Sequence, residues 1–184
     1  MSLLYLPKTI LAKDQFVLSV MIALSIYETL EEFLPNKLVE IKWPNDILID
    51  QQKICGVLIE NSIQGAYIQN CIIGIGINVL QDHFENLPNA TSMYLKGYQG
   101  NIETVLKRLF EMIEKNYLFL KAGKNTEIFE RYHNALHGKD CLLNFSDLNS
   151  DFMGTIQKVA TDGRLEILTK QGNRYFYHKE VVFL

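Results

Sequence analysis

Two lysines and a carboxylate surround one turn and are the strongest chemical signal in the sequence. The run Lys42-Trp43-Pro44-Asn45-Asp46 and the following Lys53 lie between apolar segments. Pro44 disfavours helix at the residue before it, and Asn and Asp favour turns. One such lysine would be read as ordinary surface charge. Two lysines at one turn predict a site that holds an anionic acyl or phosphoryl group. Asp46 could orient or deprotonate an incoming amine; the alternative is that it only caps the turn.

A second signal is the alternation Gly74-Ile75-Gly76-Ile77-Asn78. In a strand this pattern leaves one face almost without side chains, which often marks the close approach of a ligand. A flat ligand such as a nucleobase could lie there, with Asn78 reading its edge. The alternative is tight helix-on-sheet packing with Asn78 as a turn former. The pattern G-x-G-x-x-G of dinucleotide-binding sites is incomplete.

Composition restricts the class of protein. The 184 residues are 48% apolar, and the net charge of −3 argues against nucleic-acid binding by bulk electrostatics. The apolar stretch 16–26 is too short to cross a membrane, which needs about 20 residues, and predicts a buried helix. Three widely spaced cysteines, Cys55, Cys71 and Cys141, predict reduced thiols in a cytoplasmic protein.

The elements that must position these residues follow from periodicity and turn signals. We expect an extended run at 2–6, then helices at 15–33 (capped by Asp14), 101–121 and 126–137, with His133 and His137 as a surface pair rather than metal ligands. Short connectors predict antiparallel strands at 38–43, 47–49, 53–61 and 66–77. The fold class is therefore α+β, a mostly antiparallel sheet covered by helices.

From Lys139 onward the pattern changes to short strands. They are expected at 141–145, 152–160, 165–169, 174–177 and 181–183. Five strands in so short a segment predict a small barrel with its own core, so we expect a domain boundary near Gly138.

Three motifs in order resemble the biotin protein ligase family. They are Lys-Trp-Pro-Asn-Asp at 42–46, Lys-x-Cys-Gly-Val-Leu-Ile-Glu at 53–60 and Gly-Ile-Gly-Ile-Asn-Val at 74–79. The tail is similar to the small SH3-like carboxy-terminal domain of that family, through Phe152-x-Gly154-x-Ile156, Asp162-Gly163-x-Leu165 and Glu180-Val181. The resemblance implies a class II synthetase-like catalytic domain at 1–138 and the SH3-like domain at 139–184.

The resemblance also implies an activity: ATP and biotin give biotinyl-adenylate, and the biotin passes to a lysine of a biotin carboxyl carrier domain, with Mg²⁺ neutralising the triphosphate. Lys53 would contact the biotin carboxylate or acyl phosphate, Asp46 would assist the acceptor lysine, and Lys42 would add positive field. The implied ligand-binding residues are Trp43, Asn45, Gly56, Val57, Gly74, Gly76 and Asn78.

The sequence also departs from the family. Members carry an upstream Gly-Arg-Gly-Arg-x-Gly loop, and none of the four arginines here lies in such a loop. The expectation is a truncated catalytic domain without a DNA-binding helix-turn-helix, and an exposed sheet edge that favours self-association. Three functions stay open: a ligase, a non-catalytic relative that binds adenylate or carrier protein, and a lipoate-type ligase.

Overall fold

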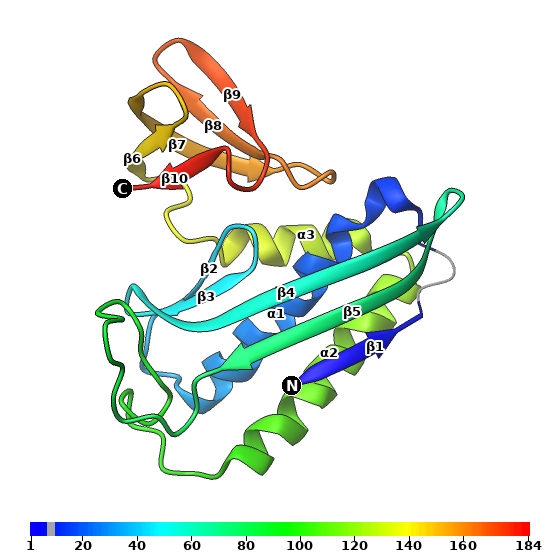
Figure 1. Ribbon diagram of the computed structural model, residues 1–184, viewed down its shortest axis with the longest axis vertical. Helices are drawn as coiled ribbons and strands as arrows, with labels where there is room; N and C mark the ends of the chain where they lie inside the picture. Colours follow the sequence, from blue (N-terminus) through cyan, green and yellow to red (C-terminus); the bar gives the residue numbers. More distant parts are fainter. Residues whose placement is uncertain (7–9) are drawn as a thin grey trace.

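The computed structural model describes residues 1–6 and 10–184 and contains two antiparallel sheets (Figure 1). The first sheet has the strand order β1-β5-β4-β3-β2. Its strands are β1 (Ser2–Tyr5), β2 (Val39–Lys42), β3 (Asp46–Ile49), β4 (Gln52–Gln64) and β5 (Tyr67–Ile77). The predicted α+β class with antiparallel pairing is confirmed.

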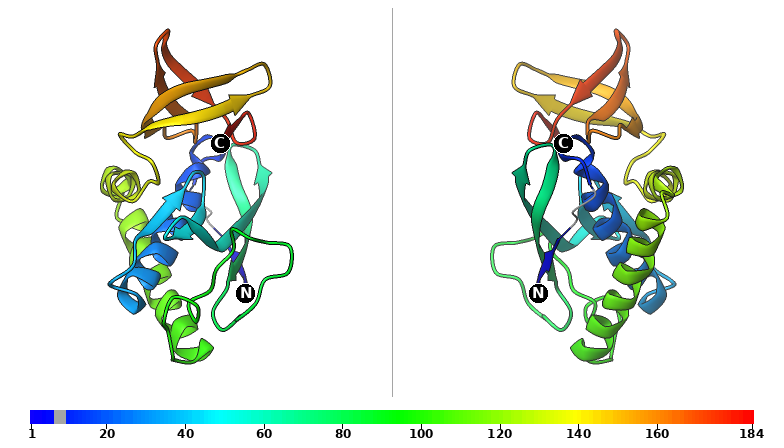
Figure 2. Two further views of the ribbon diagram at one scale, coloured as in Figure 1. Left: turned by 90° about the vertical axis from the view of Figure 1, so that its left-hand side faces the viewer. Right: turned by 90° about the vertical axis from the view of Figure 1, so that its right-hand side faces the viewer.

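Three α-helices lie on one side of the first sheet, and no helix covers the opposite face of β4 and β5 in the described part of the chain (Figure 2). They are α1 (Phe16–Phe33), α2 (Ile102–Lys121) and α3 (Asn125–Asn134). Most of α1 is buried, and residues such as Leu18 and Ile22 have no exposed surface. A helix that is apolar on nearly every side belongs in the interior, so α1 forms the centre of the core.

The start of α1 differs from the prediction. Asp14 belongs to a short 3₁₀ helix, η1 (Ala12–Asp14), and the residue at the N-cap of α1 is Gln15, which makes no side-chain capping bond. Burial therefore stabilises this helix without help from a polar cap. By contrast, the Asn101 side chain caps α2 by accepting a hydrogen bond from the Thr104 backbone.

The two edges of the first sheet differ. At β2, the Ile41 amide donates to Ala135 O, and the His137 amide donates to Ile41 O, so the segment after α3 pairs with this edge. At the other edge, β1 pairs only with β5 among the described strands. The unpaired side of β1 is thus the exposed edge of the sheet.

The second sheet has the order β10-β6-β7-β8-β9. Its strands are β6 (Leu142–Asp147), β7 (Asp151–Val159), β8 (Leu165–Thr169), β9 (Gly172–Phe176) and β10 (Val181–Phe183). All five predicted strands are present, with ends displaced by a few residues at most. Strands β9 and β10 stand at opposite ends of this order, so closure into a barrel stays a prediction.

The histidine pair is less exposed than expected. His133 Nε2 lies 3.0 Å from the Val159 backbone on β7, and His137 Nδ1 lies 3.0 Å from Glu40 Oε2 on β2. Both side chains pack between elements, which corrects the surface assignment. The three cysteines are free thiols, as predicted. No helix in the described part of the chain is long and apolar enough to span a membrane.

Candidate functional site

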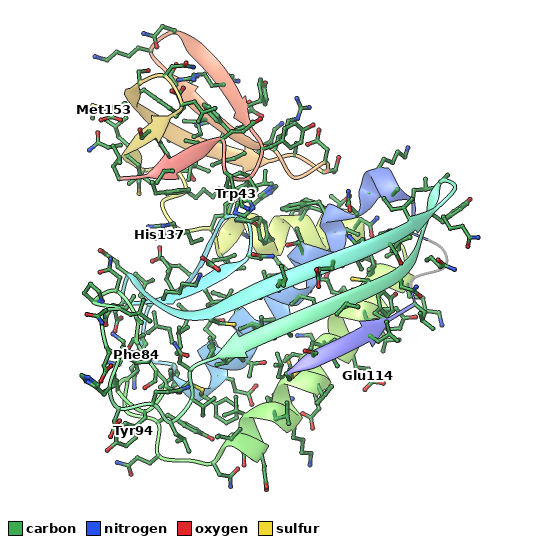
Figure 3. All side chains as sticks on the ribbon, viewed as in Figure 1. Trp43, Phe84, Tyr94, Glu114, His137 and Met153 are labelled. Carbon is green, nitrogen blue, oxygen red and sulfur yellow. The ribbon has the colours of Figure 1, made fainter. Side chains whose placement is uncertain are left out.

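The turn between β2 and β3 is anchored from three directions. Tyr132 on α3 donates its hydroxyl to Pro44 O at 2.7 Å, and the Asn45 amide donates to Ser19 Oγ on α1 at 2.9 Å. The Trp43 indole N–H donates to Gly163 O, in the turn between β7 and β8, at 3.0 Å. Figure 3 shows Trp43 where the two sheets meet. These bonds fix the turn as a rigid platform rather than a mobile surface loop.

The platform holds Asp46 against Lys53. Lys53 Nζ lies 2.6 Å from Asp46 Oδ2, and the side chains remain 49% and 32% exposed, so a ligand can reach both. The two residues come from adjacent antiparallel strands, where a register shift between Ile47 and Leu48 falls next to the pair. The structure therefore brings together the two residues to which the sequence assigned the most direct chemistry.

A cavity of about 520 Å³ opens on one side of this pair. It is lined by Lys53, Ile54, Cys55, Gly56, Gly76, Asn78 and the loop residues Leu87, Pro88, Asn89 and Ala90. The loop is held by backbone bonds from the Lys53 amide to Asn89 O at 2.7 Å and from the Thr91 amide to Lys53 O at 2.9 Å. Burial raises the pKa of the Cys55 thiol to about 12, so this cysteine stays protonated and is a poor nucleophile.

Asn78 is fixed at the wall of the first cavity. Its backbone amide donates to Ile54 O, and its side-chain amide donates to Thr91 O at 3.0 Å. The loop after β5 therefore uses one donor of the side chain, while the carboxamide oxygen can still accept a hydrogen bond. Asn78 both supports the loop and borders the cavity.

The glycines of β4 and β5 are not required by internal packing. Gly56 pairs with Gly76, and Gly74 pairs with Leu58, a residue that is 63% exposed. A Cβ added at Gly74 or Gly76 would come no closer than 3.8 Å to another atom, which is ordinary contact, and neither residue has a positive φ. The buried Ile73 and Ile75 alternate with them. This geometry argues against the helix-packing explanation and favours an external ligand on the bare face.

A second cavity of about 400 Å³ lies on the other side of Lys53. From the first sheet it is lined by Lys42, Trp43, Pro44, Asn45, Asp46, Lys53 and Val57, and from the second by His178, Lys179, Val181, Val182 and Phe183. The Lys42 ammonium lies over the Phe183 ring, 5.1 Å from its centroid. Thus Lys53 is shared by both cavities, and the positively charged Lys42 faces the second one.

The sequence prediction missed several residues of the site. No motif pointed to residues 87–90, to His178 or to Lys179. The first group approaches Lys53 through backbone hydrogen bonds, and the second lies more than 120 residues further along the chain. Of the predicted residues, only Gly74 borders neither cavity.

Comparison with known proteins gives consistent matches. The model of the family described as "Biotin/lipoate A/B protein ligase family" matches residues 1–78. The bifunctional ligase/repressor BirA of Bacillus subtilis is 27% identical over 98% of this chain and 57% of its own length. The biotin–[acetyl-CoA-carboxylase] ligase of Paracoccus denitrificans is 40% identical over 34% of this chain and 26% of its own length. The chain thus spans about half the length, or less, of these curated relatives.

Among solved structures, the biotin protein ligase from Aquifex aeolicus in complex with biotin and ATP superimposes with a TM-score of 0.81. It is 26% identical and covers all of this chain, which in turn covers 76% of that protein. The agreement extends over both sheets, so the similarity is not limited to the part that carries the motifs.

Proposed function

We propose that this chain, which resembles the biotin/lipoate A/B protein ligase family over residues 1–78, acts as a biotin protein ligase: ATP activates biotin to biotinyl-AMP, and biotin then passes to a lysine of a biotin carboxyl carrier domain. The single observation that carries this proposal is the Lys53–Asp46 pair, 2.6 Å apart and accessible, between two cavities. The name of the Paracoccus relative supports a carboxylase as the source of the acceptor.

In the first step, the biotin carboxylate attacks the α-phosphorus of ATP and pyrophosphate leaves. We assign Lys53 to the carboxylate and then to the acyl phosphate, because a positioned ammonium stabilises the charge that develops there. The bare strip at Gly56, Gly74 and Gly76 lets a ligand lie directly on the sheet, with Val57 beside it. Asn78 would accept a hydrogen bond from the adenine amino group through its carboxamide oxygen.

In the second step, the acceptor amine attacks the acyl carbon. The new amide bond forms as the bond from carbon to the phosphate oxygen breaks, and AMP leaves with the electron pair. Asp46 takes the proton lost by the amine, a role suited to a positioned carboxylate. Lys42 contributes positive field, while Trp43 and Asn45 hold the turn on which Asp46 lies.

Mg²⁺ is proposed only as a companion of the triphosphate. The described residues contain no group of three or more His, Cys, Asp or Glu arranged to hold a metal ion. Magnesium bound to nucleotides takes many of its ligands from phosphate and water, so the nucleotide would hold most of the coordination sphere.

The finer architecture belongs to the same proposal. Residues 1–138 would form the catalytic domain and residues 139–184 an SH3-like barrel, in a cytoplasmic protein. The unpaired side of β1 would be the surface for self-association, since an exposed edge recruits another strand.

A non-catalytic relative is the second candidate, and the arginines favour it. Each of the four arginines is paired with an acid away from both cavities: Arg108 with Glu32 and Glu111, Arg131 with Glu28, Arg164 with Asp162, and Arg174 with Asp147. None is free to hold an adenylate at Lys53. A lipoate-type ligase is weaker, because both named relatives and the superimposed structure are biotin ligases or BirA.

The test is biotin transfer to the apo carrier domain of an acetyl-CoA carboxylase with ATP and Mg²⁺, detected on a streptavidin blot. We expect Lys53→Ala to lower adenylate formation by about 10²–10³-fold, and Asp46→Asn to slow transfer more than adenylate formation. Lys170→Ala, on an exposed turn of the second sheet, is the matched control.

Each outcome separates the candidates. Activity that survives in Lys53→Ala would remove the role assigned to this lysine. If only a version preceded by an arginine–glycine loop of the family type labels the carrier, that loop supplies positive charge that the reaction requires. If neither version labels the carrier domain, the non-catalytic relative is favoured.

A further inference from the structure

The loop that follows β5 returns to the start of β4 and runs beside the turn between β3 and β4 (Figure 1). Part of this loop belongs to the core, because Thr91, Ser92 and Met93 are buried. A turn at 93–97 follows, closed by the Gly97 amide, which donates to Tyr94 O at 2.9 Å. The loop is therefore an ordered part of the first sheet's surroundings.

Lys96 lies in this turn and binds the neighbouring hairpin. Its Nζ donates to Asp50 Oδ2 at 3.0 Å and to Gln52 Oε1 at 2.9 Å, and its side chain is only 12% exposed. Asp50 follows β3, and Gln52 begins β4 immediately before Lys53. A cation removed from water requires partners of this kind. Lys96 thus joins the loop to the first residue of the strand that carries Lys53.

The same loop is also joined to the end of β5. The Met93 amide donates to Asn78 O at 3.0 Å, and the Tyr94 amide donates to Val79 O at 2.9 Å. The loop therefore has one attachment beside Lys53 and another at Asn78. Both of these residues line the first cavity, whereas Lys96 is not among the described residues that line it.

We propose that Lys96 is a positioning residue, which sets the spacing between Lys53 and Asn78 across the first cavity by binding the turn between β3 and β4. This inference rests on the proposed ligase function, in which one adenylate reaches Lys53 with its acyl phosphate and Asn78 with its base. Both contacts must form together in the transition state. A misplacement of about 1 Å in such a site can lower the rate by about 10²-fold.

The contacts of Lys96 supply a set of variants. Lys96→Met removes the ammonium and keeps an unbranched side chain, and Lys96→Arg keeps a charge with several donors. Asp50→Asn weakens the contact from the other side, and asparagine tolerates the φ of +47° at this position. The matched control is Lys115→Met, which removes the lysine of a 3.3 Å pair with Glu28 outside the lining of both cavities.

The first measurement is pyrophosphate release by the whole chain with biotin and ATP. We expect Lys96→Met to lower kcat by about tenfold and to change KM for ATP and for biotin by less than about twofold, because the transition state needs both contacts at once. Lys96→Arg should recover most of the loss, and Lys115→Met should match the unchanged chain. Adding Asp50→Asn to Lys96→Met should cause no further loss, since both break one contact.

The second measurement needs no catalysis. Amide hydrogen exchange reports on the backbone bonds that the Lys53, Asn78 and Thr91 amides donate at the border of the first cavity. Lys96→Met should accelerate exchange at these amides and leave the amides of β7 and β8 unchanged. An equal acceleration along the whole chain would show a general loss of stability and would overturn the proposal.

The kinetic result can overturn it as well. Unchanged kcat in Lys96→Met, an equal loss in Lys115→Met, or a rise in KM without a fall in kcat would each contradict the positioning role. A chain that releases no pyrophosphate but shows the local change in exchange would refute only the ligase function. An active chain in which Lys96→Met keeps its kcat would refute only the role of Lys96.

Discussion

At the scale of single residues, the glycines of β5 could serve either ligand binding or packing, and their surroundings distinguish the two roles. Glycine inside a regular element costs about 0.5–1 kcal/mol relative to alanine. Gly76 has neither a positive φ nor a close neighbour that would exclude a Cβ. Nothing in the packing of the described residues accounts for this cost, whereas the approach of a ligand to the bare face would.

Gly76→Ala is therefore expected to leave the free energy of unfolding unchanged or raise it by up to about 1 kcal/mol. It should raise KM for ATP or biotin, because the methyl group would occupy the floor of the first cavity. Urea unfolding and pyrophosphate release measure the two effects. Gly65→Ala, at φ +62° in the turn between β4 and β5, should show the reverse pattern. Destabilisation by Gly76→Ala would point to a packing role.

At the scale of elements, α3 connects the site to the second sheet. Tyr132 holds Pro44, and the next residue, His133, lies against the backbone of Val159 on β7. The neutral imidazole accepts a hydrogen bond from the Val159 amide in one tautomer. Burial lowers the pKa of His133 below its ordinary value, since the protonated form loses its hydration there.

The pH dependence follows from this direction. The unfolded chain binds the proton first as the pH falls, so the stabilisation by neutral His133 is complete above pH about 6.5 and is lost as the pH falls through the lowered pKa. We expect the free energy of unfolding, measured in urea, to fall between pH 7.5 and 5.5. This decrease in the free energy of unfolding should be smaller in His133→Gln. In His83→Gln, the control at an exposed position, it should equal that of the unchanged chain. His178, whose pKa burial also lowers, contributes in the same sense.

At the scale of the whole molecule, Gly163 makes a close contact between the second sheet and the rest of the protein. Its carbonyl accepts the Trp43 indole N–H, and a Cβ there would lie 2.7 Å from the Phe16 ring. The backbone of the turn between β7 and β8 therefore rests directly on the start of α1. This close approach leaves no room for a side chain between the second sheet and the start of α1.

Gly163→Ala should push the sheets apart, at a cost of about 1–3 kcal/mol for overpacking in addition to the strain of its positive φ. Gly172→Ala is the matched control, because its φ of +115° carries the same kind of strain with no neighbour within 4 Å. Trp43 is the single tryptophan of the chain, so its fluorescence reports on the junction of the two sheets, which includes the bond to Gly163. A red shift is expected in Gly163→Ala only. Identical spectra in the two variants would show that the contact does not depend on Gly163.

The sequence by itself determined the local features of this protein. Turn residues and periodicity predicted the strands around 42–46 and 53–77, the three helices and the five strands of the second sheet, because these depend on neighbours in the chain. The motifs also placed Lys53 and Asp46 in one site, since a single hairpin joins them.

Only the tertiary structure decided what surrounds that pair. It placed the loop at 87–90 and the turn at 177–180 beside Lys53, put Gly74 outside both cavities and turned His133 toward the second sheet. It also showed that α1 begins without the predicted side-chain cap and is instead a largely buried helix. These contacts join residues far apart in sequence, and the free energy that selects them comes from packing and burial of the whole chain, which no local pattern encodes.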